Sequence, residues 1–148
     1  RRGGKEKSDH FRLFAAQILM RAVSETKEDH PAYLILITGD FNDDAHDECL
    51  TYLDQHPDIR YLTKKLPRNV DGTYYYDGEW IHFDHFLAGN EKAGSLFVKD
   101  VRVVAPFWIR DKNTNGPFRF YNGVEILGGY SDHFPISLKL GFNRKSVE

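Results

Sequence analysis

The sequence predicts an α/β fold in which one mainly antiparallel or mixed sheet carries helices on one face. Residues 6–54 read as helix, strand and helix, and four strand-like runs follow after about residue 73, separated by clusters of Gly, Asn, Asp and Pro. The 148 residues, 41% of them hydrophobic, have the size and composition of one folded domain.

The first predicted helix covers residues 6–29. Its apolar residues recur at steps of three and four, which is the period of a helix with one apolar face. The helix ends at His30 and Pro31, because the residue before a proline avoids the helical conformation. The predicted apolar face consists of Phe11, Phe14, Ala15, Ile18, Leu19, Ala22 and Val23.

A strand and a second helix follow. Residues 33–38 form a β-rich run whose unbroken apolarity predicts a strand covered on both faces. After a turn at Gly39, Asp43 or Asp44 caps a helix that continues to about residue 54, with Leu50 and Leu53 facing inward.

The rest of the chain reads as strands with one long loop. The strands cover residues 73–76, 80–88, 97–104 and 134–140. Since the helices cover only one side of the sheet, something else has to cover its second apolar face. Residues 106–129 are irregular and rich in Asn, Gly and aromatic residues; a segment of this length is often a functional loop, and the alternative is a disordered insertion.

Composition sets few limits on function. A net charge of −2 gives no overall attraction to nucleic acids, and Cys49 lies in a predicted helix as a buried, inert thiol. No segment approaches the roughly 20 apolar residues of a membrane span. The opening residues 1–4 resemble the middle of a longer gene product, so the sequence predicts no localisation.

Two polar motifs lie where predicted strands meet loops. Asp40 and Asn42 follow the strand at 33–38, while Asp132 and His133 precede the last strand. Each motif alone is explained by ordinary turn and capping chemistry. Sheet enzymes nevertheless often place their catalytic groups at such positions.

Asp84 adds a third segment to this set. It lies inside a strand pattern, where alternation puts it on one face with His82 and Phe86. A buried carboxylate needs a partner, and His133 is the predicted one. Carboxylate and amide oxygens suit hard cations such as Mg²⁺ or Mn²⁺, and a carboxylate with an imidazolium suits phosphoester hydrolysis.

In this order and spacing, the segments 39–42, 83–86 and 131–135 resemble the endonuclease/exonuclease/phosphatase superfamily. Its members include pancreatic-type deoxyribonucleases, apurinic endonucleases, bacterial sphingomyelinases and inositol polyphosphate phosphatases. Residues 1–4 and 72–80 are most similar to bacterial members with no settled substrate.

The resemblance implies a hydrolase with a role for each of these residues. Asp40 would position or deprotonate the attacking water, and Asn42 would hold the metal or the phosphate. Asp132 would be a further metal ligand. Asp84 would orient His133, which would stabilise the charge of the scissile phosphate.

The resemblance also implies that half of the domain is missing. The family fold is a four-layer α-β-β-α sandwich, and residues 1–148 match its C-terminal half. The chain alone is therefore expected to be inactive, and its bare sheet face is expected to contact the N-terminal half or a second copy.

Other predictions concern the substrate. Arg2 and Arg119 are candidate phosphate ligands, and Trp80 is a candidate ring-stacking residue. Nucleic acid, a lipid head group and a small phosphorylated molecule all remain possible, as a diester or a monoester. The alternatives are a catalytically silent sandwich that acts as a binding module and, resting only on the aromatic loop, an unrelated carbohydrate-binding β protein.

Overall fold

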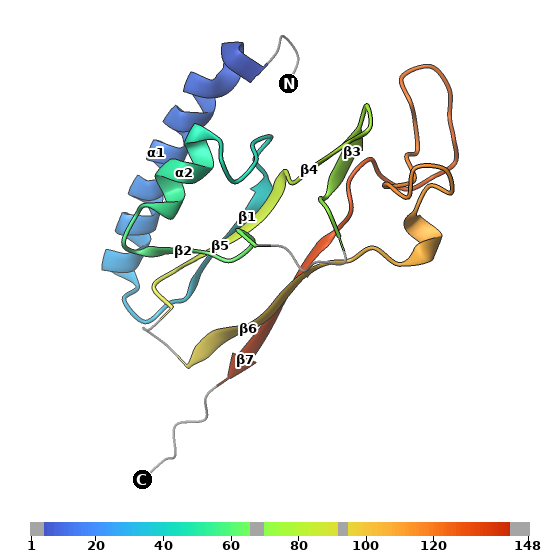
Figure 1. Ribbon diagram of the computed structural model, residues 1–148. Helices are drawn as coiled ribbons and strands as arrows, with labels where there is room; N and C mark the ends of the chain where they lie inside the picture. Colours follow the sequence, from blue (N-terminus) through green and yellow to red (C-terminus); the bar gives the residue numbers. More distant parts are fainter. Residues whose placement is uncertain (1–4, 66–69, 92–94, 143–148) are drawn as a thin grey trace.

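The computed structural model describes residues 5–65, 70–91 and 95–142, and within them it confirms the α/β class and the antiparallel pairing (Figure 1). No described helix is long and apolar enough to cross a membrane. In chain order the elements are α1 (Lys5–Asp29), β1 (Ile35–Asp40), α2 (Glu48–Asp54), β2 (Ile59–Tyr61), β3 (Tyr74–Tyr76), β4 (Glu79–Ile81), β5 (Asp84–Gly89), β6 (Leu96–Val103), the 3₁₀ turn η1 (Phe107–Ile109) and β7 (Ile136–Phe142).

Helix α1 forms where predicted, but it buries a different face. Ala16, Met20 and Val23 are buried against the sheet and α2, whereas Phe11 and Phe14 are 67% and 60% exposed. At 100° per residue the two sets lie on opposite sides of the helix. Of the predicted apolar face, Val23 and Leu19 pack in this core. Because α1 carries apolar residues on both sides, periodicity alone predicted the buried face only in part.

The central sheet has the order β1-β5-β2, with antiparallel pairs throughout. Ile37 and Leu87 are register partners that face the helices and are buried with them in one core. On the opposite face Leu36 is 39% exposed, so the prediction that this strand is covered on both faces is wrong for the described chain.

The predicted strand 80–88 is broken in the structure. Strand β4 pairs only with β3, through a hairpin whose turn residues Asp77 and Gly78 both have positive φ angles of 50° and 86°. Strand β5 begins at Asp84 and joins the central sheet instead. The chain therefore passes from one sheet to another at His82 and Phe83, and simple alternation does not relate His82 to Asp84.

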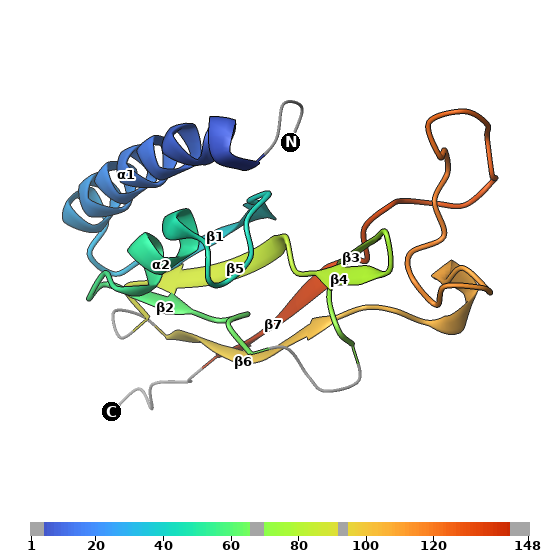
Figure 2. The same cartoon turned by 45° about the horizontal axis from the view of Figure 1, so that its top comes forward.

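Strands β6 and β7 form a separate antiparallel ribbon. Figures 1 and 2 show it on the side of the central sheet that faces away from the helices. Phe134, just before β7, is buried at the centre of a small second core with Val70, Val103 and Ile109. The ribbon leaves Phe97 and Phe142 38% and 66% exposed, so an apolar surface remains on this side.

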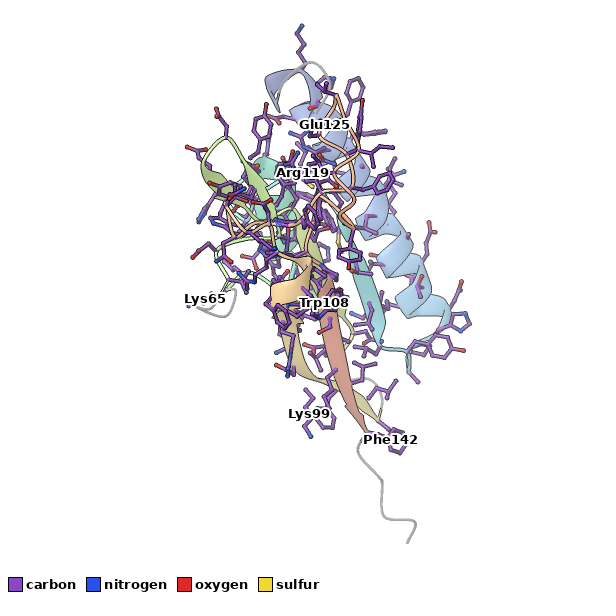
Figure 3. All side chains as sticks on the ribbon, turned by 90° about the vertical axis from the view of Figure 1, so that its right-hand side faces the viewer. Lys65, Lys99, Trp108, Arg119, Glu125 and Phe142 are labelled. Carbon is purple, nitrogen blue, oxygen red and sulfur yellow. The ribbon has the colours of Figure 1, made fainter. Side chains whose placement is uncertain are left out.

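The segment between β6 and β7 is an ordered loop. Backbone N–H groups of Phe118 and Tyr130 donate to the carbonyls of Ile109 and Phe118, and Leu127 N–H donates to Phe120 O. These bonds brace the loop across its width, which argues against a disordered insertion. Arg119 and Glu125 lie in the upper part of the loop and Trp108 below them (Figure 3).

Candidate active site

Four segments line a cleft of about 550 Å³ at the edge of the central sheet. They are the end of β1, the hairpin strand β3, the β4–β5 crossing and the turn before β7. Asp84 lies directly beside the cleft, through its contact with His133 and its position opposite Asp40. The lining residues are Asp40, Asn42, Tyr74, Tyr76, Ile81, Phe83, Asp132 and His133.

Asn42 holds the carboxylate of Asp40. Its backbone N–H donates to Asp40 Oδ1 at 2.8 Å, and its side-chain Nδ2 donates to Oδ2 at 3.2 Å. These bonds require Asn42 to adopt a left-handed conformation, with φ of 52°, which asparagine enters more readily than most residues. The Asp-x-Asn spacing thus fixes the carboxylate at the mouth of the cleft.

Asp84 and His133 form a half-buried pair. The Nδ1–H of His133 donates to Asp84 Oδ2 at 2.7 Å, and the side chains are 22% and 18% exposed. Burial alone would lower the pKa of His133, but the hydrogen bond to Asp84 and the charges of Asp84, Asp40 and Asp132 raise it overall. For Asp84, burial is outweighed by the hydrogen bonds with His133 and Thr73, and its pKa is lowered. Both shifts favour a charged imidazolium–carboxylate pair.

Thr73 positions this pair, and sequence reasoning missed it. Its buried hydroxyl accepts from the N–H groups of Phe83 and Asp84, at 3.2 and 3.3 Å. Its carbonyl accepts from Phe134 N–H at 2.7 Å. One residue therefore ties the start of β5 to the turn that carries His133. A threonine beside three tyrosines gives no such signal in the sequence.

Two buried groups anchor the loop that follows Asn42. Arg12 Nε lies 2.8 Å from Asp43 Oδ2, with only 2% of the aspartate side chain exposed. His85 is fully buried: its Nε2–H donates to Asp43 O, and its Nδ1 accepts from the hydroxyl of Tyr61, both at 2.8 Å. Burial lowers the pKa of His85, so the ring is neutral. Sequence reasoning gave neither Arg12 nor His85 a role.

The donor set fits a hard divalent cation. Ligand atoms of Asp40, Asp84 and His133 lie within 4.8 Å of one another. Asp40 and Asp84 are direct register partners, and like charges in that position repel. His133 compensates Asp84, whereas Asp40 and Asp132 form no ion pair with a basic side chain within the described part of the chain. Carboxylate and amide oxygens at such a point suit Mg²⁺ or Mn²⁺.

Two of the predicted substrate residues, Arg119 and Trp80, do not line the cleft. Arg119 donates through Nη2 to Tyr75 O at 2.7 Å and lines a neighbouring hollow. Trp80 packs on Phe134 at a centroid distance of 5.9 Å, against the second core, and does not line the cleft. Arg2 lies outside the described residues. Their roles toward a substrate stay predictions.

Comparisons with known proteins identify the family of the chain and solved structures that share its fold. No curated protein matches the chain. The solved structures that share the fold include endonuclease/exonuclease/phosphatase family proteins of Bacteroides thetaiotaomicron and Bacteroides vulgatus, and a mannosyl-6-phosphatase of Bacteroides thetaiotaomicron. Their TM-scores are 0.62, 0.60 and 0.57, at 19%, 17% and 19% identity, and the matches cover 97%, 91% and 95% of this chain.

The chain spans about half the length of these structures, because the same matches cover 48%, 45% and 48% of theirs. At these identities the likeness shows the fold alone. The family itself is shown by its sequence profile, described as endonuclease/exonuclease/phosphatase family, which matches residues 1–141. The chain belongs to the endonuclease/exonuclease/phosphatase family.

Proposed function

We propose that this chain is the C-terminal part of a divalent-metal-dependent phosphoesterase that cleaves a phosphodiester or phosphomonoester by direct attack of water. The observation that carries the proposal is the hydrogen bond of 2.7 Å between Asp84 and His133, since His133 lines the same cleft as Asp40 and Asp132. Family membership supports hydrolysis of a phosphoester. The mannosyl-6-phosphatase with a similar fold is one phosphatase built on this scaffold.

Each side chain has a distinct task in this proposal. Asp40, held by two hydrogen bonds from Asn42, orients the attacking water and accepts its proton. His133 keeps Nδ1–H on Asp84, which leaves its other ring N–H to donate to a phosphate oxygen as negative charge grows there. The hydrogen bond to Asp84 and the nearby carboxylate charges raise the pKa of His133, which favours the protonated form of that donor.

Asp40, Asn42 and Asp132 would hold the cation. A bound Mg²⁺ or Mn²⁺ supplies Lewis-acid polarisation of the phosphoryl group. The side chains present fit this role because their oxygen donors line one cleft and carry more negative charge than His133 alone can balance.

Full activity requires more polypeptide than residues 1–148 in this proposal. The similar structures are about twice as long, and the face of the central sheet away from the helices keeps exposed apolar residues. We expect the N-terminal half of the domain, or a second copy of the chain, to cover that surface. Residues 1–148 alone should then turn over substrate negligibly; full turnover by a monomer of this length would refute that part.

The experiment is Mg²⁺-dependent hydrolysis of an aryl phosphodiester and an aryl phosphomonoester by the complete gene product. His133→Ala should lower kcat by a factor of roughly 10²–10⁴, the usual contribution of a positioned acid or base. His30→Ala is the matched control, since His30 is exposed after α1 and stacks only on Tyr33. Activity unchanged in His133→Ala would overturn the assignment of that residue.

Calorimetry with Mg²⁺ and Mn²⁺ distinguishes the proposed enzyme from the alternative, a catalytically silent binding module. The enzyme binds metal and loses affinity in Asp132→Ala. Absence of turnover on both esters together with absence of metal binding would replace the enzyme by the binding module.

A further inference from the structure

The catalytic cleft is bordered by a second hollow. This hollow has a volume of about 410 Å³ and lies between the tip of the β3–β4 hairpin and the long loop 106–130. Tyr76 lines both spaces, so its side chain is the rim between them. A leaving group larger than a few atoms that starts at His133 can extend across this ring into the hollow.

Tyr76 presents a supported aromatic surface. It is 61% exposed, and its ring lies nearly parallel to that of Tyr74, with 14° between the planes. The guanidinium of Arg119 lies 5.1 Å from the Tyr74 centroid and 6.0 Å from the Tyr76 centroid. Tyr74 also contacts the ring of His133, at 4.9 Å between centroids. The aromatic row therefore begins at the catalytic histidine and ends at the rim.

The loop that forms the far wall of the hollow packs closely on β3 and is held by internal hydrogen bonds. A Cβ at Gly116 would lie 2.8 Å from Tyr75 Cβ, so the loop backbone touches β3 at a position that only glycine fits without a shift. Asp111 Oδ1 accepts from the backbone N–H groups of Asn113 and Thr114 and from the Thr114 hydroxyl. The hydrogen bond from Thr114 N–H contributes most to the lowered pKa of Asp111, which keeps this carboxylate charged.

The charges in the hollow select against a polyanion. Two carboxylates, Asp77 and Asp111, line it, and Arg119 is its only basic lining residue among those described. That guanidinium already contacts two tyrosine rings and a carbonyl. A further phosphate in the hollow would meet repulsion, whereas hydroxyl groups would find carboxylate and amide acceptors in Asp77, Asp111 and Asn113.

We propose that the hollow is the leaving-group subsite for a neutral, hydroxyl-rich ring, so that the substrate is a phosphomonoester of a sugar. This inference rests on the proposed function. The ring packs on Tyr76, and its hydroxyls donate to Asp77 and Asp111. Water oxygen bonds to phosphorus, the bond from phosphorus to the sugar oxygen breaks, and that oxygen takes up one proton. The products are inorganic phosphate and the free sugar.

The test compares kcat/KM of the complete, Mg²⁺-loaded gene product for glucose 6-phosphate, methyl phosphate and a short oligonucleotide. Glucose 6-phosphate should exceed methyl phosphate by about tenfold or more in kcat/KM, and in Tyr76→Ala the ratio of the two kcat/KM values should fall toward one. Tyr76→Phe should retain the higher ratio, because the ring remains. Tyr33→Ala is the control: Tyr33 is 57% exposed and lies at the far end of β1.

A binding measurement separates this inference from the proposed function. Calorimetry with glucose 6-phosphate should give an affinity that falls about tenfold in Tyr76→Ala and also falls in Asp77→Asn. Such binding without hydrolysis of any ester would refute the proposed phosphoesterase activity and support the proposed subsite. Hydrolysis with an unchanged substrate ratio in Tyr76→Ala, a higher kcat/KM for the oligonucleotide, or no binding of glucose 6-phosphate would overturn the subsite.

Discussion

The two parts of this molecule are held together by different forces. The helical region, made of α1, β1, α2, β2 and β5, buries ten described residues in one apolar core. The aromatic region, made of β3, β4, β6, β7 and the loop 106–130, has a described core of four, and its loop is braced by backbone hydrogen bonds. The helical region therefore has the larger buried core, while the aromatic region shapes the pocket and leaves apolar side chains such as Phe107 and Phe142 exposed.

The catalytic candidates lie where the two regions meet. Asp40 and Asp84 come from the helical region, and Asp132 and His133 come from the aromatic region. The Asp84–His133 hydrogen bond and the Thr73 contacts join them. Catalysis in the proposed enzyme thus depends on docking of the two regions as much as on either one.

The largest expected effect comes from breaking the Asp84–His133 hydrogen bond, which joins the two regions. In the complete gene product, Asp84→Asn removes the charge that keeps His133 protonated and fixes its ring. Phosphoester turnover should fall by roughly 10²–10⁴, and the pKa of His133 should fall toward its ordinary value. Steady-state kinetics and histidine-ring NMR titration measure the two effects.

Asp100→Asn is the control, because this carboxylate pairs with Arg102 on the exposed surface of β6. It should leave both kcat and the His133 titration unchanged. If the pKa of His133 in Asp84→Asn equalled that of the wild type, the proposed role of Asp84 in raising it would be contradicted.

The next effect tests whether the core of the helical region is as tightly packed as its burial indicates. Met20→Ala opens a cavity beside Leu53 in that core and should lower the free energy of unfolding by about 2–5 kcal/mol. Phe14→Ala, on the exposed side of the same helix, should change it by no more than about 0.5 kcal/mol. Urea denaturation compares them. Equal losses would mean that a partner covers the Phe14 side.

The smallest expected effect is the pH dependence of the free energy of unfolding, to which His82 and His133 contribute with opposite signs. Burial, followed by the neighbouring His85, lowers the pKa of His82 to about 4. A histidine with a lowered folded pKa contributes stability above its unfolded pKa of about 6.5 and loses it as pH falls through the folded value. Unfolding free energy should therefore drop by on the order of 3 kcal/mol between pH 7 and pH 4 from this group.

Comparing the wild type with His82→Gln isolates that contribution, since the glutamine does not titrate. His133 has the opposite sign: its pKa is raised, so its contribution is present below the unfolded value and is lost as pH rises through the folded one. Parallel pH curves for the wild type and His82→Gln would show that His82 is accessible to solvent protons in the folded state.

The sequence predicted what depends on local pattern. The helix at α1, the strand before Asp40 and the polar ends of strands all carry local signals, and family membership, inferred from the polar motifs, is confirmed. The buried side of α1 was beyond reach because apolar residues lie on both of its sides. The break before Asp84 was also missed, since residues 80–88 read as one uninterrupted strand, whereas the structure divides them between β4 and β5.

The supporting residues were beyond sequence reasoning for a different reason. Arg12 and Asp43, His85 and Tyr61, and Thr73 and Phe134 are pairs distant in sequence that meet only in the folded chain. The type of each residue alone does not predict its distant partner. Such contacts follow from tertiary structure, and the polar group is buried only because the partner is there.

The conformation of the hairpin turn at Asp77 and Gly78, next to the rim residue Tyr76, follows from local sequence preferences. Both residues have positive φ, the pattern of a type I′ turn, which Asp-Gly forms readily from its own local preferences. The orientation of Tyr76 beside Asp77 is thus encoded within eight residues, Tyr74 to Ile81, and not by the distant core. In the proposed enzyme, exchange of this short hairpin would change Tyr76 and Asp77 in the proposed subsite, whereas Asp40, Asp132 and His133 come from other segments of the chain.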